Sequence, residues 1–138
     1  GELRLELMDK NGIEFTLVSL NAPAVQAIVD VKKAIDVAKR ANDFLAECVA
    51  RHPKRFAGFA ALPMQDPQAA AAELTRCVKQ LGFKGALVNG FTQAVVADSV
   101  IYYDIPEYRD FWATVSATFR FPDAAIIAIA SSAGRLQR

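Results

Sequence analysis

Hydrophobic positions occur along the chain in two patterns, short continuous runs and runs spaced three or four residues apart. The continuous runs predict buried strands over residues 13–20, 56–62 and 85–88. The spaced runs predict amphipathic helices over residues 2–10, 25–51, 67–81 and 106–116. Because strands and helices alternate, the pattern predicts an α/β fold built from parallel β/α units.

The stretch from Arg51 to Phe91 predicts the arrangement of its elements most clearly. Asp66 is placed to cap a helix that begins with Pro67, and Gly82 stands where that helix should end. With a strand on either side, the helix completes a βαβ unit, whose two strands are parallel. The C-terminal ends of such strands usually carry the chemistry, and here they read Leu62-Pro63 and Asn89-Gly90-Phe91.

The number of units is too small for a closed barrel. The sequence predicts three β/α units, whereas a (β/α)8 barrel needs about eight strands. We therefore expect residues 1–116 to form an incomplete (β/α)8, or TIM, barrel fragment. Residues 117–138 are expected to be a divergent tail in which 126–130 could form a strand and 131–134 is unstructured.

Composition and charge exclude several partners. The chain has 138 residues, is 53% hydrophobic and 22% charged, and carries a net charge of +1, which is typical of one globular domain without a nucleic-acid or membrane partner. No apolar run approaches the roughly 18–20 residues of a membrane span. Cys48 and Cys77 fall on apolar helix faces. We expect two buried free thiols, and not a disulfide or a reactive pair, and free thiols indicate a cytoplasmic location.

Residues with catalytic potential are scattered. His52 is the only histidine, and its place at a predicted helix end favours a capping or surface role over metal ligation. Asp104 is expected to cap the helix over 106–116, and the neighbouring carboxylates do not form an acid–base pair. We assign no catalytic residue and no metal ligand from these patterns.

Several segments resemble one enzyme family. They are SLNAPAVQAI (19–28), RANDFLAE (40–47), HPKRFAGFAALPMQDPQAA (52–70), ELTRCV (73–78), LGFKGALVNGF (81–91) and YYDIPEYRDFW (102–112). Together they resemble the 2,3-dihydroxybenzoate / γ-resorcylate decarboxylase family, in the ACMSD-like branch of the amidohydrolase superfamily. The resemblance covers most of residues 1–112.

This resemblance implies a metal-dependent, non-oxidative decarboxylase of hydroxybenzoates that forms a (β/α)8 barrel and a homo-oligomer. The implied substrate is an aromatic carboxylic acid, and the implied cofactor is a divalent metal, zinc or manganese. The family's metal ligands include a histidine in a His-Pro-Arg-Asn-type motif, where this chain has Phe119-Arg120-Phe121-Pro122. We therefore expect the metal ligands to be absent from the chain, and the chain alone to be inactive.

The residues that the resemblance carries over are those around the substrate. They are Asn21 and Pro23, after the first predicted strand, and Asn89 and Phe91, after the third. The Asn89 amide could bind a substrate hydroxyl or carboxylate, or Asn89-Gly90 could simply form a turn. Phe91 could contact an aromatic substrate or fill the core.

Two other functions remain open from the sequence. The chain could be a non-catalytic α/β module that acts through a partner chain, because an open sheet leaves strand edges and apolar faces uncovered. It could also belong to a hydrolase, since the amidohydrolase superfamily includes both chemistries. The LVNGF and YYD…FW motifs favour the decarboxylase.

Overall fold

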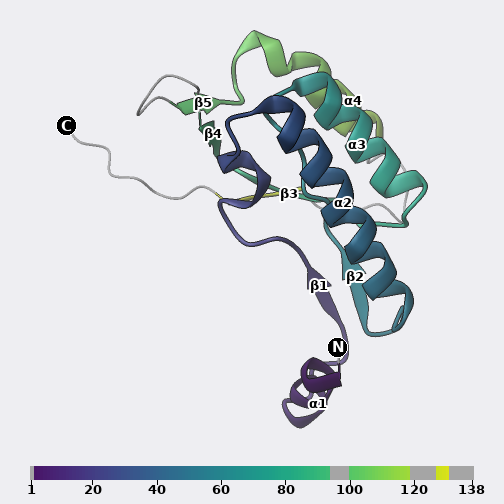
Figure 1. Cartoon of the computed structure of the whole chain (residues 1–138). Coiled ribbons are helices and arrows are strands. Elements are labelled where there is room, and N and C mark those ends of the chain that lie inside the picture. Colours follow the sequence, from purple (N-terminus) through teal and green to yellow (C-terminus); the bar gives the residue numbers. More distant parts are fainter. Residues whose placement is uncertain (1, 94–99, 119–126, 131–138) are drawn as a thin grey trace, which may run out of the picture.

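The computed structural model describes residues 2–93, 100–118 and 127–130 (Figure 1). The helices are α1 (Glu2–Lys10), α2 (Val31–Ala50), α3 (Pro67–Lys79) and α4 (Arg109–Thr118), with single 3-10 turns η1 (Ala24–Ala27) and η2 (Pro106–Tyr108). The strands are β1 (Thr16–Val18), β2 (Phe56–Gly58), β3 (Ala86–Asn89), β4 (Phe91–Gln93), β5 (Val100–Tyr102) and β6 (Ile127–Ala130).

Parallel pairing links four of the strands into a row. β1 pairs with β2, and β3 pairs with β6, both in parallel register. A parallel bridge between Ala60 and Ala86 joins the two pairs. There the Ala60 N–H donates to the Gly85 carbonyl at 2.8 Å, and the Leu87 N–H donates to the Ala60 carbonyl at 3.2 Å. The predicted α/β fold with parallel β/α units is confirmed, and the strand expected within 126–130 is present.

Local sequence signals set the limits of α3. The Asp66 carboxylate accepts hydrogen bonds from the N–H groups of Gln68 and Ala69 at 2.9 and 3.0 Å, and Pro67 occupies the first turn. Beyond the helix, Gly82 adopts a φ of +70°, a left-handed conformation that glycine adopts without steric cost. The Phe83 N–H then donates back to the Cys77 carbonyl at 3.0 Å. The cap residues therefore begin and end this helix close to where the sequence predicts.

The main core lies between the strand row and α3 and α4. The two helices lie side by side, with α2 next to α3 (Figure 1). Fully buried side chains from this region include Leu62, Met64, Leu74, Cys77, Val88 and Phe111. Burial of these side chains provides most of the stabilisation that holds the strand ends in place.

The helix predicted over residues 25–51 is wrong as a single element. The chain instead forms the short turn η1, an extended segment and then α2. Asp30 has a ψ of 113°, and its carboxylate accepts a hydrogen bond from the Lys33 N–H at 2.8 Å. Because an N-cap residue must leave helical geometry, Asp30 separates the two helical segments.

Two expectations for residues 91–116 also require correction. The sequence predicts a loop over residues 91–101, which are only moderately apolar. The structure instead forms an antiparallel hairpin of β4 and β5, in which Phe91 pairs with Tyr102. Asp104 does not cap the following helix: the turn η2 begins after Ile105, without a side-chain cap, and α4 starts only at Arg109. Pro106 at the start of η2 fixes the backbone in place of a cap.

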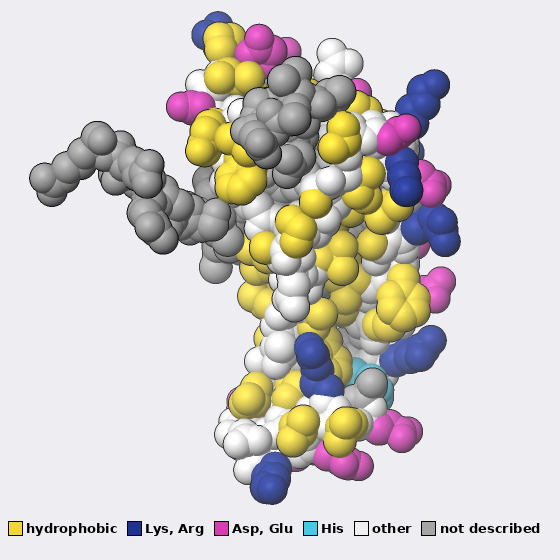
Figure 2. All heavy atoms as spheres, turned by 60° about the vertical axis from the view of Figure 1, so that its left-hand side comes forward, with side chains coloured by type: hydrophobic (Ala, Val, Ile, Leu, Met, Phe, Trp, Pro, Cys, Tyr) yellow, Lys and Arg dark blue, Asp and Glu magenta, His cyan; other side chains and the backbone are white. Residues whose placement is uncertain are grey.

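An apolar surface lies along β1 and its flanking segments. The exposed apolar side chains are Ile13, Phe15, Leu17 and Leu20. In the view of Figure 2, hydrophobic side chains run down the middle of the molecule, and most charged side chains lie toward the edges. In a closed barrel every strand has a neighbour on both sides. Among the described strands, β1 pairs with β2 alone. Within the same described ranges, no helix has both the length and the apolar character needed to cross a bilayer.

Gly58 provides a test of packing in this fold. A Cβ added to Gly58 would lie 2.8 Å from Cε1 of Phe83, a buried ring. We expect Gly58→Ala to lower the free energy of unfolding by about 1–3 kcal/mol, because the ring must shift within a filled core. Urea unfolding measures the loss. Adding Phe83→Leu should recover part of it, and strictly additive effects of the two substitutions would contradict the proposed clash.

Candidate functional site

The loop that follows β1 meets the C-terminal end of β3. The Asn89 side-chain amide donates a hydrogen bond to the Pro23 carbonyl at 3.2 Å, across 66 positions of the sequence. Within the loop the Ala22–Pro23 peptide bond is cis, and the Ala24 N–H donates to the Asn21 carbonyl at 2.9 Å. The structure thus brings together the two strand ends that carry the candidate residues Asn21, Pro23 and Asn89.

Gln26 joins these strand ends more closely than any of the four candidates. Its side chain is 4% exposed, and its Oε1 accepts from the Asn89 N–H at 2.8 Å. Its Nε2 donates to the Asn89 and Phe91 carbonyls at 3.1 and 3.0 Å. Gln26 is not among the residues predicted from the sequence. The available signal was one carboxamide among apolar residues in the segment Val25–Ile28.

Phe91 contributes both its backbone carbonyl and its ring to the site. Its carbonyl accepts from Gln26, while its half-buried ring packs edge-on against Tyr102, with ring centroids 6.1 Å apart. Asn21 and Pro23 are exposed beside this hairpin. The exposed edge of the site therefore combines amide, carbonyl and aromatic groups.

Tyr103 lies beneath the hairpin and is uncharged at neutral pH. Its hydroxyl hydrogen-bonds to Gln26 and to the Thr92 hydroxyl, the latter at 2.6 Å. Burial raises the pKa of Tyr103 to about 12, although the hydrogen bonds to Thr92 and Gln26 act to lower it. A shallow depression of about 310 Å³ lies above it, lined by Gly90, Tyr102, Tyr103, Asp104 and Trp112. This region can bind a ligand through hydrogen bonds and aromatic contact.

The described residues do not fit a divalent-metal site. Among them, no three histidine, cysteine, aspartate or glutamate side chains stand close enough to share a metal ion. His52 follows the end of α2, where its N–H donates to the Val49 carbonyl at 3.0 Å and its ring lies 6.3 Å from that of Phe56. Phe56 begins β2, so His52 lies at the opposite end of the parallel row from Asn89.

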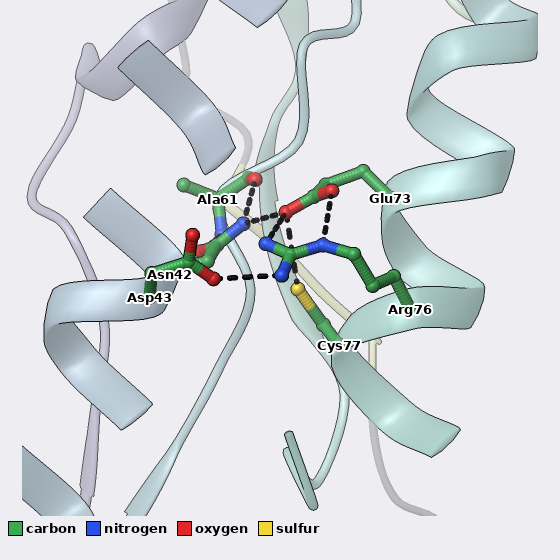
Figure 3. Close-up of polar contacts among 6 residues, drawn as sticks. All are labelled: Asn42, Asp43, Ala61, Glu73, Arg76 and Cys77. Carbon is green, nitrogen blue, oxygen red and sulfur yellow. Dashed lines mark hydrogen bonds and ion pairs between the residues drawn. The ribbon is translucent and has the colours of Figure 1, made fainter. Parts of the chain in front are cut away.

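A buried ionic cluster connects α2 to α3 (Figure 3). The Glu73 carboxylate is 2% exposed and accepts hydrogen bonds from Arg76 at 2.7 and 2.9 Å and from Asn42 at 2.8 Å. Arg76 also pairs with Asp43 at 2.7 Å. The Asn42 amide brackets the backbone of Ala61, accepting from its N–H and donating to its carbonyl, both at 2.9 Å. The cluster thereby fixes the chain just before the strand end at Leu62.

Charge pairing keeps Glu73 ionised despite its burial. Burial acts to raise the pKa of Glu73, but hydrogen bonds from Arg76 and Asn42 and the charge of Arg76 together hold it below its ordinary value. Burial and the neighbouring Glu73 charge raise the pKa of the Cys77 thiol. Neither group is therefore prepared to transfer a proton near neutral pH, and the cluster serves to hold the helices together.

Comparison with known proteins identifies the family. Residues 1–118 match the family model described as Amidohydrolase (Amidohydro_2). The chain belongs to the amidohydrolase family.

Relatives of this amidohydrolase chain include several decarboxylases. It is 61% identical over 117 residues to the gamma-resorcylate decarboxylase of Rhodococcus jostii, covering 83% of this chain and 36% of the relative. The dihydroxybenzoic acid decarboxylase of Polaromonas sp. JS666, with bound manganese and 2-nitroresorcinol, is 61% identical, with a TM-score of 0.81 over 84% of this chain and 35% of that one. A 2,6-dihydroxybenzoate decarboxylase complexed with 2,6-dihydroxybenzoate is 60% identical, with a TM-score of 0.80 over 83% of this chain and 36% of that one.

These comparisons confirm the family resemblance and the barrel-type fold, and they show a divalent metal, manganese, in the family. The amidohydrolase chain spans about a third of the length of the curated relatives that it matches.

Proposed function

We propose that this amidohydrolase chain forms part of a non-oxidative decarboxylase of dihydroxybenzoates, in which it supplies contacts to the substrate. The observation that carries the proposal is the meeting of Pro23 and Asn89 at one strand-end site, in a chain 61% identical to decarboxylases of such substrates. The Asn89 amide is suited to bind a hydroxyl or carboxylate oxygen of the substrate. Phe91, beside it, offers an aromatic ring for contact with the substrate ring.

The proposed contribution of the described residues is to bind and orient the substrate. They place no cluster of metal ligands at the strand ends, and the buried Tyr103 hydroxyl is held by Gln26 and Thr92, so we assign them no step of bond cleavage. Holding an aromatic ring by its hydroxyl and carboxylate groups in a fixed orientation is itself a large part of catalysis. We further propose a homo-oligomer, as the family resemblance implies, and a cytoplasmic location, supported by the free Cys48 and Cys77.

A chimera tests the proposed function. Residues 1–118 would replace the matching segment of the Polaromonas decarboxylase, and CO2 release from 2,6-dihydroxybenzoate would be measured with manganese present. We expect turnover, and we expect Asn89→Ala to lower kcat/KM by about 10- to 100-fold, the value of a hydrogen bond to a charged group. The matched control is Asn11→Ala, which removes an exposed amide that donates to the Leu7 carbonyl, far from Asn89 in the sequence.

Two outcomes would contradict the proposal. One is a folded, manganese-loaded chimera that releases no CO2, and cleavage of an aryl ester by that chimera would favour the hydrolase. The other is an equal effect of the Asn89 and Asn11 substitutions on kcat/KM.

The chain of 138 residues alone is expected to release no CO2 above the uncatalysed rate, because its described residues include no cluster that could hold a metal. The measurement is CO2 release over a long incubation with manganese and 2,6-dihydroxybenzoate, with the chimera as positive control. Turnover by the isolated chain would show that it carries a complete active site.

A further inference from the structure

Gln26 replaces a neighbouring strand at the end of β3. Along the edge of β3 that faces β2, the backbone pairs with Ala60. The next residue in register is Leu62, but its carbonyl turns away to accept from the Met64 N–H at 2.9 Å. At Asn89 the Gln26 carboxamide takes over, accepting from the Asn89 N–H at 2.8 Å and reaching its carbonyl at 3.1 Å. A carboxamide has the donor and acceptor of a peptide group, so Gln26 continues the ladder for one more residue.

The same side chain also fixes the direction in which the chain leaves β3. Its Nε2 reaches the Phe91 carbonyl at 3.0 Å and is bonded to the Tyr103 hydroxyl. Gln26 lies on η1, directly after the loop that holds Pro23. One buried carboxamide therefore connects the loop after β1, the end of β3 and the hairpin of β4 and β5.

We propose that Gln26 is a positioning residue that sets the Asn89–Phe91 segment against the Asn21–Pro23 loop and so fixes the substrate contacts. The substrate part of this proposal rests on the proposed function. Every polar atom of the Gln26 side chain is engaged with protein groups, and the side chain is 4% exposed. It therefore acts through Asn89 and Phe91, and not by direct contact with the substrate.

The first test uses the isolated chain and requires no activity. In Gln26→Met, a variant of similar length without polar groups, amide hydrogen exchange at Asn89 should rise at least tenfold, because its N–H loses its acceptor. The matched control is Asn42→Ala, which removes the other buried carboxamide that brackets backbone, at Ala61. There the Ala61 amide should lose protection and the Asn89 amide should keep it. Unchanged Asn89 exchange in Gln26→Met, measured where the chain is folded, would overturn the proposal.

The second test places the same two substitutions in the chimera. Gln26→Met should raise KM for 2,6-dihydroxybenzoate by about tenfold while kcat changes less than threefold, because displaced contacts from Asn89 and Phe91 weaken binding of the substrate and of the transition state alike. Asn42→Ala should leave KM unchanged at a temperature where both variants are folded. Equal KM shifts in the two variants, or no shift in Gln26→Met, would overturn the positioning role. An inactive parent chimera would instead contradict the proposed function, and Asn89 exchange alone would then decide the role of Gln26.

Discussion

Arg76→Met is expected to lower the free energy of unfolding by about 3–5 kcal/mol at pH 7, the cost of breaking a buried ion pair from one side. The substitution leaves the Glu73 carboxylate buried without its cation, with Asn42 and Cys77 as its remaining partners. Urea unfolding followed by circular dichroism measures the loss. The matched control is Arg40→Met, at an arginine that is 78% exposed and pairs with Asp36 at 3.6 Å, where the loss should stay below about 1 kcal/mol.

The pH dependence gives this prediction a second, independent check. Because the folded pKa of Glu73 lies below its ordinary value of 4.5, its stabilising contribution is fully present above about pH 4.5 and is lost as the pH falls through the lowered value. In Arg76→Met the main lowering influence is gone, and burial raises the pKa of Glu73. The difference in stability between the two proteins should therefore shrink as the pH falls. Adding Glu73→Gln should restore much of the stability at pH 7, and a double variant as unstable as Arg76→Met would contradict the ion-pair account.

Phe111→Ala is expected to cost about 3–5 kcal/mol, because it opens a cavity in the main core. The Phe111 ring is fully buried and lies between Tyr108 and Trp112, with centroid distances of 6.4 and 4.9 Å. The aromatic contacts add to the loss, since each is worth roughly 0.5–1.5 kcal/mol beyond the buried area. Thermal and urea unfolding measure the change.

The matched control for this cavity is Phe44→Ala, at a phenylalanine on α2 that is 66% exposed. Its loss should be small, because little apolar area leaves water when Phe44 folds into place. Similar losses at Phe111 and Phe44 would show that α4 is not packed as described.

Sequence predicted the fold best where local chemistry determines it. Asp66, Pro67 and Gly82 act on neighbouring backbone groups, so the limits of α3 and the parallel strands around it follow from short-range rules. Asp30 also acts locally, but it lies within a run whose hydrophobic spacing continues across it, and periodicity alone does not show a break there. The hairpin of β4 and β5 depends on pairing between Phe91 and Tyr102, which no local signal specifies.

The site shows the same division. Asn21, Pro23 and Asn89 follow predicted strands, so a candidate site at the strand ends could be proposed from the sequence and its family resemblance. Gln26 and Glu73 could not be identified in this way, because their roles depend on partners in other elements. The Gln26 carboxamide binds backbone 63 and 65 positions away, and Glu73 depends on Asn42, 31 positions earlier. Composition does not predict such pairings.

The burial of Cys77 gives the chain a built-in reporter of its own opening. This thiol is fully buried and its pKa is raised, whereas Cys48 on α2 is only half-buried. Since alkylating reagents attack the exposed thiolate, Cys48 should be modified first and Cys77 only when α3 separates from the strands. The rate of the second modification, followed by mass spectrometry without any engineered label, therefore measures how often α3 separates from the strands.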